Sequence, residues 1–167
     1  PQRCTRCILP NTLQSIRFDA DGVCNYCRKF EQDFAGWGQI AERKQTEFEV
    51  LLEHARKLKR PYDCLVPLSG GKDSTFALYL ASKVYKLKCL AMTYDNGFLT
   101  TPAKNNIARA LESTTADHIF YHMNKQTSVE MFRTFLVKTG EFCNSCMRGI
   151  NYSIEMAARA YKIPLVI

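Results

Sequence analysis

An apolar strand that passes through two glycines directly into a helix is the feature that most restricts how this chain can fold. Residues 65–68 are apolar, Gly70 and Gly71 follow, and the next segment carries apolar residues at helical spacing (Phe76, Ala77, Leu80 and Val84). Glycines let a backbone approach a bound anion closely, and the N-terminus of the following helix offers free N–H groups to it. The pattern therefore predicts a phosphate-binding turn in an α/β domain.

The remainder of the chain from residue 61 continues this strand and helix alternation, which is typical of a parallel sheet covered by helices. We predict strands at residues 63–68, 88–94, 117–121 and 164–167, and helices at 74–85, 102–113, 128–139 and 150–161. Because a chain rarely stops inside a buried strand, we expect the protein to continue beyond Ile167. The domain of residues 61–167 is then incomplete.

A single amphipathic helix is predicted for residues 38–60, between this domain and the N-terminal residues. Its apolar stripe consists of Phe48, Leu51, Leu52, Ala55 and Leu58, and it ends before Pro61. It is interpreted as a connector. The basic run at residues 56–60 is typical of a solvated helix end.

Four cysteines in residues 1–37 predict a small metal-binding module. Cys4 and Cys7 form one C-x-x-C pair, and Cys24 and Cys27 form a second pair after a sixteen-residue spacer. This spacing indicates a closed structural Zn²⁺ site, which would organise a segment too poor in large apolar residues to fold alone. Disulfides or an iron–sulfur cluster are the alternatives.

The glycine turn itself reads Ser69-Gly70-Gly71-Lys72-Asp73-Ser74. A Walker A loop would need glycine where Val66 stands and serine or threonine where Asp73 stands, so that motif is absent. The six residues instead resemble the Ser-Gly-Gly-x-Asp-Ser signature of the PP-loop ATP pyrophosphatases.

This resemblance implies a Rossmann-like domain that binds the β- and γ-phosphates of ATP while a substrate oxygen attacks the α-phosphate. Ser69, Gly70, Gly71 and Ser74 would bind ATP, and Lys72 and Asp73 would also be catalytic, with Asp73 helping to hold Mg²⁺. Asp95 lies where such sheets bind ligands. It would accept a hydrogen bond from the ribose, or else belong to a simple Asp-Asn-Gly turn.

A second pair, Cys143 and Cys146, is predicted just before the helix of residues 150–161, where the positive helix terminus favours thiolate. Three interpretations stay open: a second metal site completed from elsewhere, a sulfur-transfer or iron–sulfur site, and unreactive packed thiols. Cys64 and Cys89, inside predicted strands, are expected in the core. None of the three histidines is assigned a role.

The N-terminal residues 4–10, 16–19 and 22–27, together with residues 140–146, resemble the N-acetyl sugar amidotransferases of bacterial surface-polysaccharide (lipopolysaccharide) biosynthesis. The resemblance implies an ATP-dependent ligase that adenylylates a nucleotide-linked N-acetyl sugar and transfers ammonia to it. We expect a soluble cytoplasmic protein, because no apolar run is long enough to cross a bilayer and the N-terminal residues do not resemble a signal segment. A separate glutaminase would supply the ammonia, because no glutaminase motif is visible. No membrane partner is expected, and a homodimer is left open.

An alternative is a PP-loop tRNA thiolation enzyme, because residues 143–150 also resemble the cysteine and arginine segment of 2-thiocytidine and 2-thiouridine enzymes. The net charge of +7 permits a polyanion partner, but residues 1–60 hold 11 basic and 8 acidic side chains and the rest hold 12 and 8. This even spread weighs against a tRNA-binding face. A nucleotide-binding module without catalysis is the third interpretation.

Overall fold

The computed structural model describes residues 1–167, which form two compact units, Pro1–Phe48 and Glu49–Ile167. The first contains α1 (Asn25–Asp33), and α2 (Trp37–Lys57) crosses the boundary between them. The boundary thus lies inside the connecting helix predicted for residues 38–60. Of the apolar stripe predicted for this helix, only Leu52 and Ala55 are buried, whereas Leu51 is exposed, as is Leu58, which lies just beyond the end of α2.

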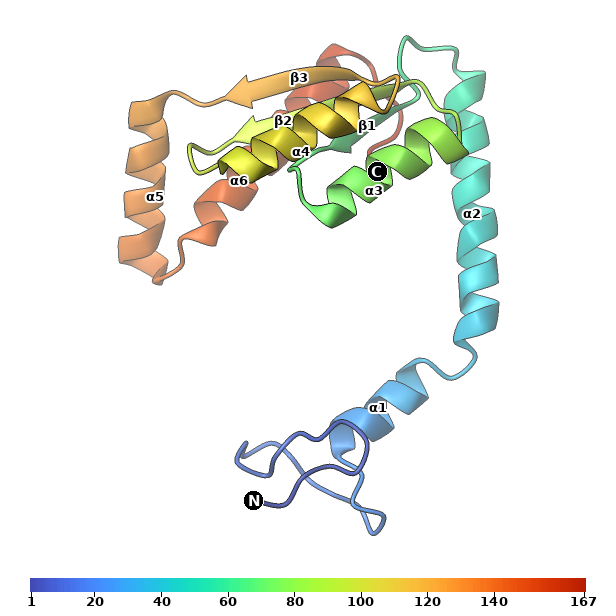
Figure 1. Ribbon diagram of the computed structural model, residues 1–167, viewed down its shortest axis with the longest axis vertical. Helices are drawn as coiled ribbons and strands as arrows, with labels where there is room; N and C mark the ends of the chain where they lie inside the picture. The colour runs from blue at the N-terminus through green and yellow to red at the C-terminus, as the bar shows by residue number, and fades with distance from the viewer. The chain divides into compact units, whose positions relative to one another are not determined.

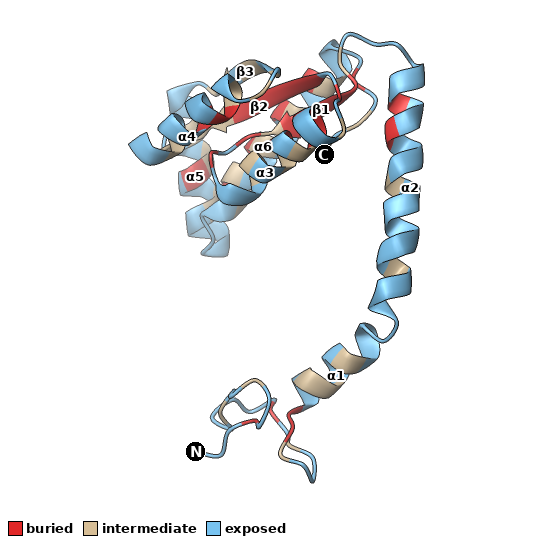
Figure 2. Cartoon of the chain, turned by 45° about the vertical axis from the view of Figure 1, so that its right-hand side comes forward, coloured by how far each residue is buried: buried red, intermediate tan, exposed pale blue.

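The second unit is an α/β domain with a parallel three-stranded sheet, which confirms the predicted α/β class, while the PP-loop fold of this domain stays a prediction (Figure 1). The strands β1 (Cys64–Pro67), β2 (Cys89–Asp95) and β3 (Asp117–His122) lie in the order β1-β2-β3. Buried residues concentrate on β1 and β2 (Figure 2). β3 is an edge strand with half of its residues exposed.

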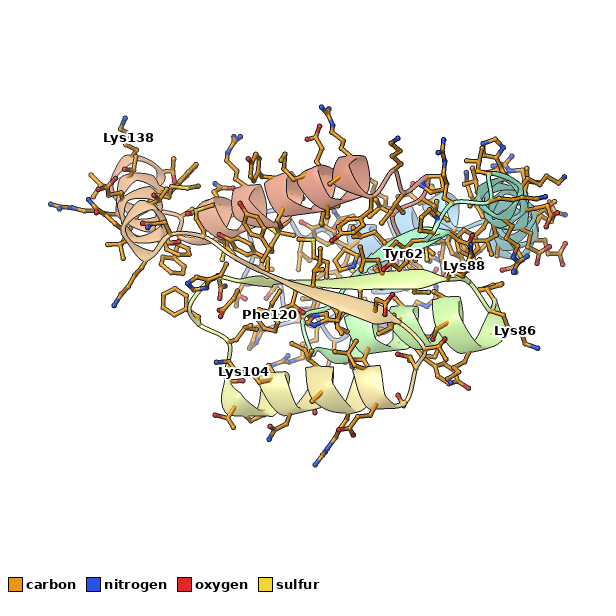
Figure 3. The ribbon with its side chains drawn as sticks, turned by 90° about the horizontal axis from the view of Figure 1, so that it is seen from above. Tyr62, Lys86, Lys88, Lys104, Phe120 and Lys138 are labelled. Carbon is orange, nitrogen blue, oxygen red and sulfur yellow. The ribbon has the colours of Figure 1, made fainter.

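Helices cover both faces of this sheet, as the view from above shows (Figure 3). α3 (Lys72–Tyr79), which continues into the π-helical segment η1 (Leu80–Val84), and α4 (Thr101–Glu112) lie on one face. α6 (Cys143–Ala160) packs on the other face and contacts α5 (Lys125–Thr139). One core cluster, formed by Leu65, Leu90, Met92, Ala157 and Ile163, lies between the sheet and α6.

The prediction of a fourth strand at residues 164–167 is wrong, because the segment does not form a strand. It does lie beside β1, as the predicted strand would. The segment forms one isolated parallel bridge between Leu65 and Val166. Leu65 N donates to Leu165 O at 2.9 Å, and Ile167 N donates to Leu65 O at 3.0 Å. Two hydrogen bonds make a bridge and no continuous ladder.

Cys64 and Cys89 are core residues, as predicted, and they are register partners on adjacent strands. Their Sγ atoms are 3.6 Å apart on the sheet face opposite the α6 core. The hydrogen bond to Cys89 and burial raise the pKa of the Cys64 thiol above its ordinary value. The same hydrogen bond lowers the pKa of the Cys89 thiol, so it is burial and not a high pKa of both thiols that keeps the pair from reagents in the folded domain.

None of the helices is both long and apolar enough to cross a membrane.

Candidate functional site

The predicted phosphate loop connects the end of β1 to the start of α3. Its two serines close it: Ser69 Oγ and Ser74 Oγ are 3.0 Å apart, and Ser69 N donates to Ser74 Oγ at 3.2 Å. Gly71 is the N-cap of α3 and has no side chain to satisfy the first N–H groups of the helix. Those N–H groups are therefore free to receive an anion.

Gly70 is required at its position for two reasons. Its φ of +78° lies in the left-handed region, and a Cβ atom there would collide with the backbone carbonyl of Ala103 on α4. Asn106 on the same helix donates from Nδ2 to Gly70 O at 3.0 Å. α4 therefore packs directly against the loop and holds it by this hydrogen bond. The spacing of residues in the sequence did not predict this contact.

Lys72 and Asp73 begin α3 and project into solvent. Their side chains are 92% and 90% exposed, and Lys72 Nζ lies 3.6 Å from Asp73 Oδ1. Neither side chain supports the fold, so both are available to a ligand on the loop.

A hollow of about 340 Å³ opens beside the loop at the carboxyl ends of β1 and β2, on the side of α6. The hydroxyls of Ser69 and Ser74 border it, and its walls are mostly apolar; the other lining residues are Pro67, Leu68, Met92, Tyr94, Asn96, Leu99, Cys146, Ile150 and Ile154. We call it the loop-side hollow. An apolar hollow with a few polar groups at a strand end is typical of ligand sites in α/β domains.

Asp95, the candidate ribose contact, does not line the loop-side hollow. Its Oδ1 accepts from Gly97 N at 2.9 Å, and its Oδ2 lies 3.7 Å from His122 Nδ1. It borders a separate hollow of about 230 Å³ near Phe98. The neighbouring residues Tyr94 and Asn96 reach the loop-side hollow instead.

The second cysteine pair lies inside α6 and not before it, because the helix begins at Cys143, seven residues earlier than predicted. Cys143 is exposed, whereas Cys146 is half-buried in the wall of the loop-side hollow. Asn96 Nδ2 donates to Cys146 Sγ at 3.2 Å. No cluster of three or more Cys, His, Asp or Glu side chains includes this pair.

Gly149 allows α6 to approach the end of β2. It is buried, and a Cβ atom there would overlap the phenol ring of Tyr94. Because Tyr94 also lines the loop-side hollow, Gly149 controls the width of that hollow.

We expect Gly149→Ala to destabilise the second unit by about 1–3 kcal/mol, because the added methyl must displace a packed aromatic ring. Thermal or urea unfolding followed by circular dichroism measures the change. The control is Gly38→Ala, at a helical glycine of the first unit where no atom lies within 4 Å of the added Cβ, and it should leave the unfolding of the second unit unchanged. Equal stability of the two variants would contradict the close packing of α6 on Tyr94.

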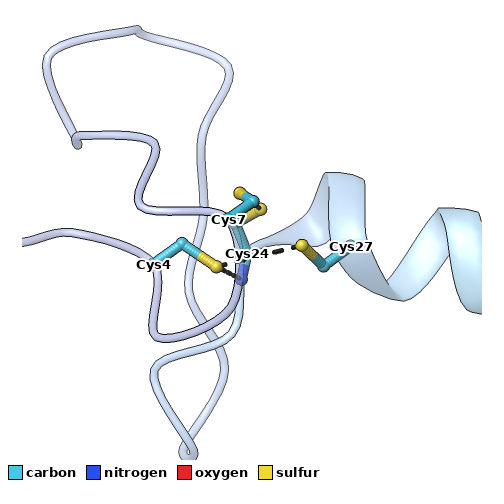
Figure 4. A group of neighbouring side chains, drawn as sticks. All are labelled: Cys4, Cys7, Cys24 and Cys27. Atoms are coloured by element: carbon cyan, nitrogen blue, oxygen red, sulfur yellow. Dashed lines mark hydrogen bonds between the residues drawn. The ribbon is translucent and has the colours of Figure 1, made fainter.

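The four N-terminal cysteines form the candidate metal centre (Figure 4). All four Sγ atoms lie within 4.8 Å of one another, with Cys7 and Cys24 Sγ 3.6 Å apart. The N–H groups of Arg6 and Cys24 donate to Cys4 Sγ at 3.4 and 3.2 Å, as expected around a metal-bound thiolate. Four soft sulfurs converging on one point can hold a metal ion such as Zn²⁺.

The protonation of these thiols shows why a cation suits the cluster. Burial opposes ionisation of Cys4, but backbone N–H donors outweigh it and lower the pKa of Cys4 to about 6. The hydrogen bond to Cys7, together with burial, raises the pKa of Cys27 to about 12. Without a metal the four sulfurs therefore cannot all be thiolates at neutral pH.

Little else holds this module together. Its buried core consists of Cys4, Ile16, Val23 and Cys24. At the surface, Arg28 pairs with Asp19 at 2.7 Å, and this hydrogen bond lowers the pKa of the Asp19 carboxyl. Exposed ion pairs contribute little, so a bound metal would be the main source of stability.

Comparison with known proteins adds one distant relative. No family model matches the chain. It is 26% identical over 152 residues to an uncharacterized protein of Methanocaldococcus jannaschii, MJ1599, a match that covers 89% of this chain and 51% of that protein. The chain thus spans about half the length of this relative.

Proposed function

We propose that this chain is the ATP-using part of a PP-loop amidotransferase that acts on a nucleotide-linked N-acetyl sugar. The observation that carries the proposal is the phosphate loop with the loop-side hollow next to it. A glycine loop at a helix N-terminus suits a polyphosphate, and an apolar hollow at the same strand ends suits a nucleoside.

In this proposal the phosphates of ATP lie on the loop, and the adenosine enters the loop-side hollow. The volume of about 340 Å³ lies at the lower end of the range of small-molecule sites, which fits a nucleoside with its phosphates outside. Lys72 would neutralise phosphate charge. The exposed carboxylate of Asp73 is a hard oxygen ligand of the kind that Mg²⁺ prefers, and the ion would reduce the charge that opposes attack.

The proposed reaction has two steps. A carboxyl or amide oxygen of the sugar bonds to the α-phosphorus while the bond to the bridging oxygen of pyrophosphate breaks. Ammonia then adds to the activated carbon, AMP leaves with the oxygen and its electron pair, and the nitrogen loses a proton. The loop contributes most in the first step, because its N–H groups and Lys72 stabilise the charge that develops on the departing pyrophosphate.

We assign the four-cysteine cluster a structural Zn²⁺ ion. All four positions around the metal are taken by sulfur, so no position is open for a substrate. The ammonia would come from a separate glutaminase subunit, as the resemblance to the sugar amidotransferases implies.

One observation favours tRNA thiolation as the second candidate. Cys146 lines the loop-side hollow together with the loop serines, so a sulfur on it would lie close to a nucleotide bound there. The even spread of the net charge of +7 still favours the sugar substrate.

Pyrophosphate release by the full-length protein tests the proposal. ATP and Mg²⁺ are supplied with a panel of UDP-linked N-acetyl sugars or with tRNA, each with and without ammonium. We expect release to require a sugar, and nitrogen from labelled ammonium to appear in the sugar product. Release that requires tRNA would support thiolation, and no release with any acceptor would contradict both candidates.

A further inference from the structure

A second and larger hollow, of about 650 Å³, opens on the opposite side of the phosphate loop, between α3 and α4. It starts at Gly70 and Gly71 and extends past Phe76 and Tyr79 to Thr114, beyond the end of α4. We call it the α3–α4 groove. The loop therefore has a hollow on each side, and ATP in the loop-side hollow would leave this groove free.

Two aromatic rings stand exposed in the α3–α4 groove. Phe76 is 60% and Tyr79 50% exposed, and their rings are nearly parallel, with an interplanar angle of 17° and centroids 6.4 Å apart. At least half of the surface of each residue is therefore open to solvent. Exposed, similarly oriented aromatic faces are the surfaces on which nucleic-acid bases stack.

The charged residues of the groove indicate the charge of its ligand. Its only charged lining residues are Lys72 and Arg109, which are both cations, and no carboxylate lines it. Asn106 borders it too, with its amide bound to the loop at Gly70 O. A lining with cations and no anions favours a ligand with negative charge, and arginine suits phosphate in particular.

The groups that could bind a ligand follow one another along α3. The loop and Lys72 come first, and the rings of Phe76 and Tyr79 follow over the next two turns, about 10 Å along the helix. A ligand with its base on the rings would have its phosphates near the cations and its remaining group at the loop. A sugar joined to a nucleoside diphosphate has its parts in this sequence.

We infer that the α3–α4 groove binds the nucleoside diphosphate part of the sugar substrate. The inference rests on the proposed function and deepens it. The base stacks on Phe76 and Tyr79, the diphosphate pairs with Arg109, and the sugar reaches the loop where the α-phosphate of ATP is attacked. Anchoring by a part of the substrate that does not react would position the reacting oxygen.

Titration calorimetry on the full-length protein tests this groove. The probes are UDP-N-acetylglucosamine, UDP and GDP, and a non-cleavable α,β-methylene analogue of ATP is titrated separately. We expect Phe76→Ala and Arg109→Ala each to weaken binding of the best diphosphate probe by about 10- to 100-fold. Affinity for the ATP analogue should stay within about twofold in both variants.

Two exposed residues outside the groove provide matched controls (Figure 3). Phe120 on β3 is 49% exposed, and Lys104 lies on the exposed surface of α4; neither lines the groove. Phe120→Ala and Lys104→Ala should leave the affinity for the diphosphate probes unchanged. Circular dichroism of all four variants confirms that they are folded.

The outcomes separate this inference from the proposed function. If the ATP analogue binds but the diphosphate probes do not, or if Phe76→Ala and Arg109→Ala bind them normally, the groove assignment is overturned and the ATP site stands. If Phe76→Ala instead weakens binding of the ATP analogue, the groove is part of the ATP site and the assignment to the diphosphate is overturned. If the two variants change the sedimentation mass without changing probe affinity, the groove is an interface between copies. If the ATP analogue does not bind at all, the proposed function fails first.

Discussion

Removal of the zinc ion that we propose for the cysteine cluster is expected to unfold residues 1–48 and to leave the sheet of the second unit folded. The N-terminal core has only four buried residues, two of which are cysteines of the candidate metal centre. Structural zinc contributes on the order of 10–16 kcal/mol to coupled binding and folding, which is more than such a core can replace. Hydrogen exchange measured by mass spectrometry, before and after chelation, reports on each unit separately.

Substitution at the cluster gives the same result without a chelator. We expect Cys24→Ser to lose its zinc and the exchange protection of residues 1–48, because the cluster keeps only three of its sulfur ligands. Cys143→Ser, an equal change at an exposed cysteine outside the cluster, should retain one zinc per chain. A protected, metal-free Cys24→Ser variant would show that zinc does not organise this module.

Replacement of Lys72 by alanine is expected to reduce pyrophosphate release by at least about 10²- to 10³-fold, the usual cost of removing one group that stabilises charge in a transition state. The side chain is 92% exposed, and it forms an ion pair with Asp73, which is 90% exposed. Its loss should therefore leave the melting temperature within about 2 °C of that of the parent protein.

The control for this substitution is Lys104→Ala, which removes an exposed lysine of α4 that borders neither hollow. It should keep the rate of pyrophosphate release. Normal turnover by Lys72→Ala would exclude this residue from the reaction. A large fall in melting temperature would show that the lysine has a structural role and that the loss of rate is indirect.

The turn at residues 69–74 and the parallel sheet were predictable because each has a local signal. Gly70 occupies a conformation that side chains rarely adopt, and the buried strands are continuous apolar runs. The N-terminal ends of two helices have no such local signal in the sequence. α1 follows Cys24 and α6 follows Phe142, and neither residue caps its helix with a side-chain hydrogen bond. α1 was therefore not predicted at all, and α6 was placed too late.

Contacts between distant residues were also beyond the reach of sequence patterns. Asn106 supports the loop from 36 residues away, and Asn96 meets Cys146 across 50 residues. Asp95 was the predicted polar residue at the end of β2, but its carboxylate accepts from its own turn at Gly97. The adjacent Asn96 faces the loop-side hollow instead. Only the folded backbone decides which of two neighbouring polar residues points that way.

The paired thiols of Cys64 and Cys89 have a practical consequence for following this domain in solution. They are the first residues of two neighbouring strands, and both are buried. An alkylating reagent reaches them when this end of β1 and β2 opens, so the rate at which the pair is modified records how often the strands separate there. The protein thus carries its own reporter of local opening at this end of the sheet, without any introduced label.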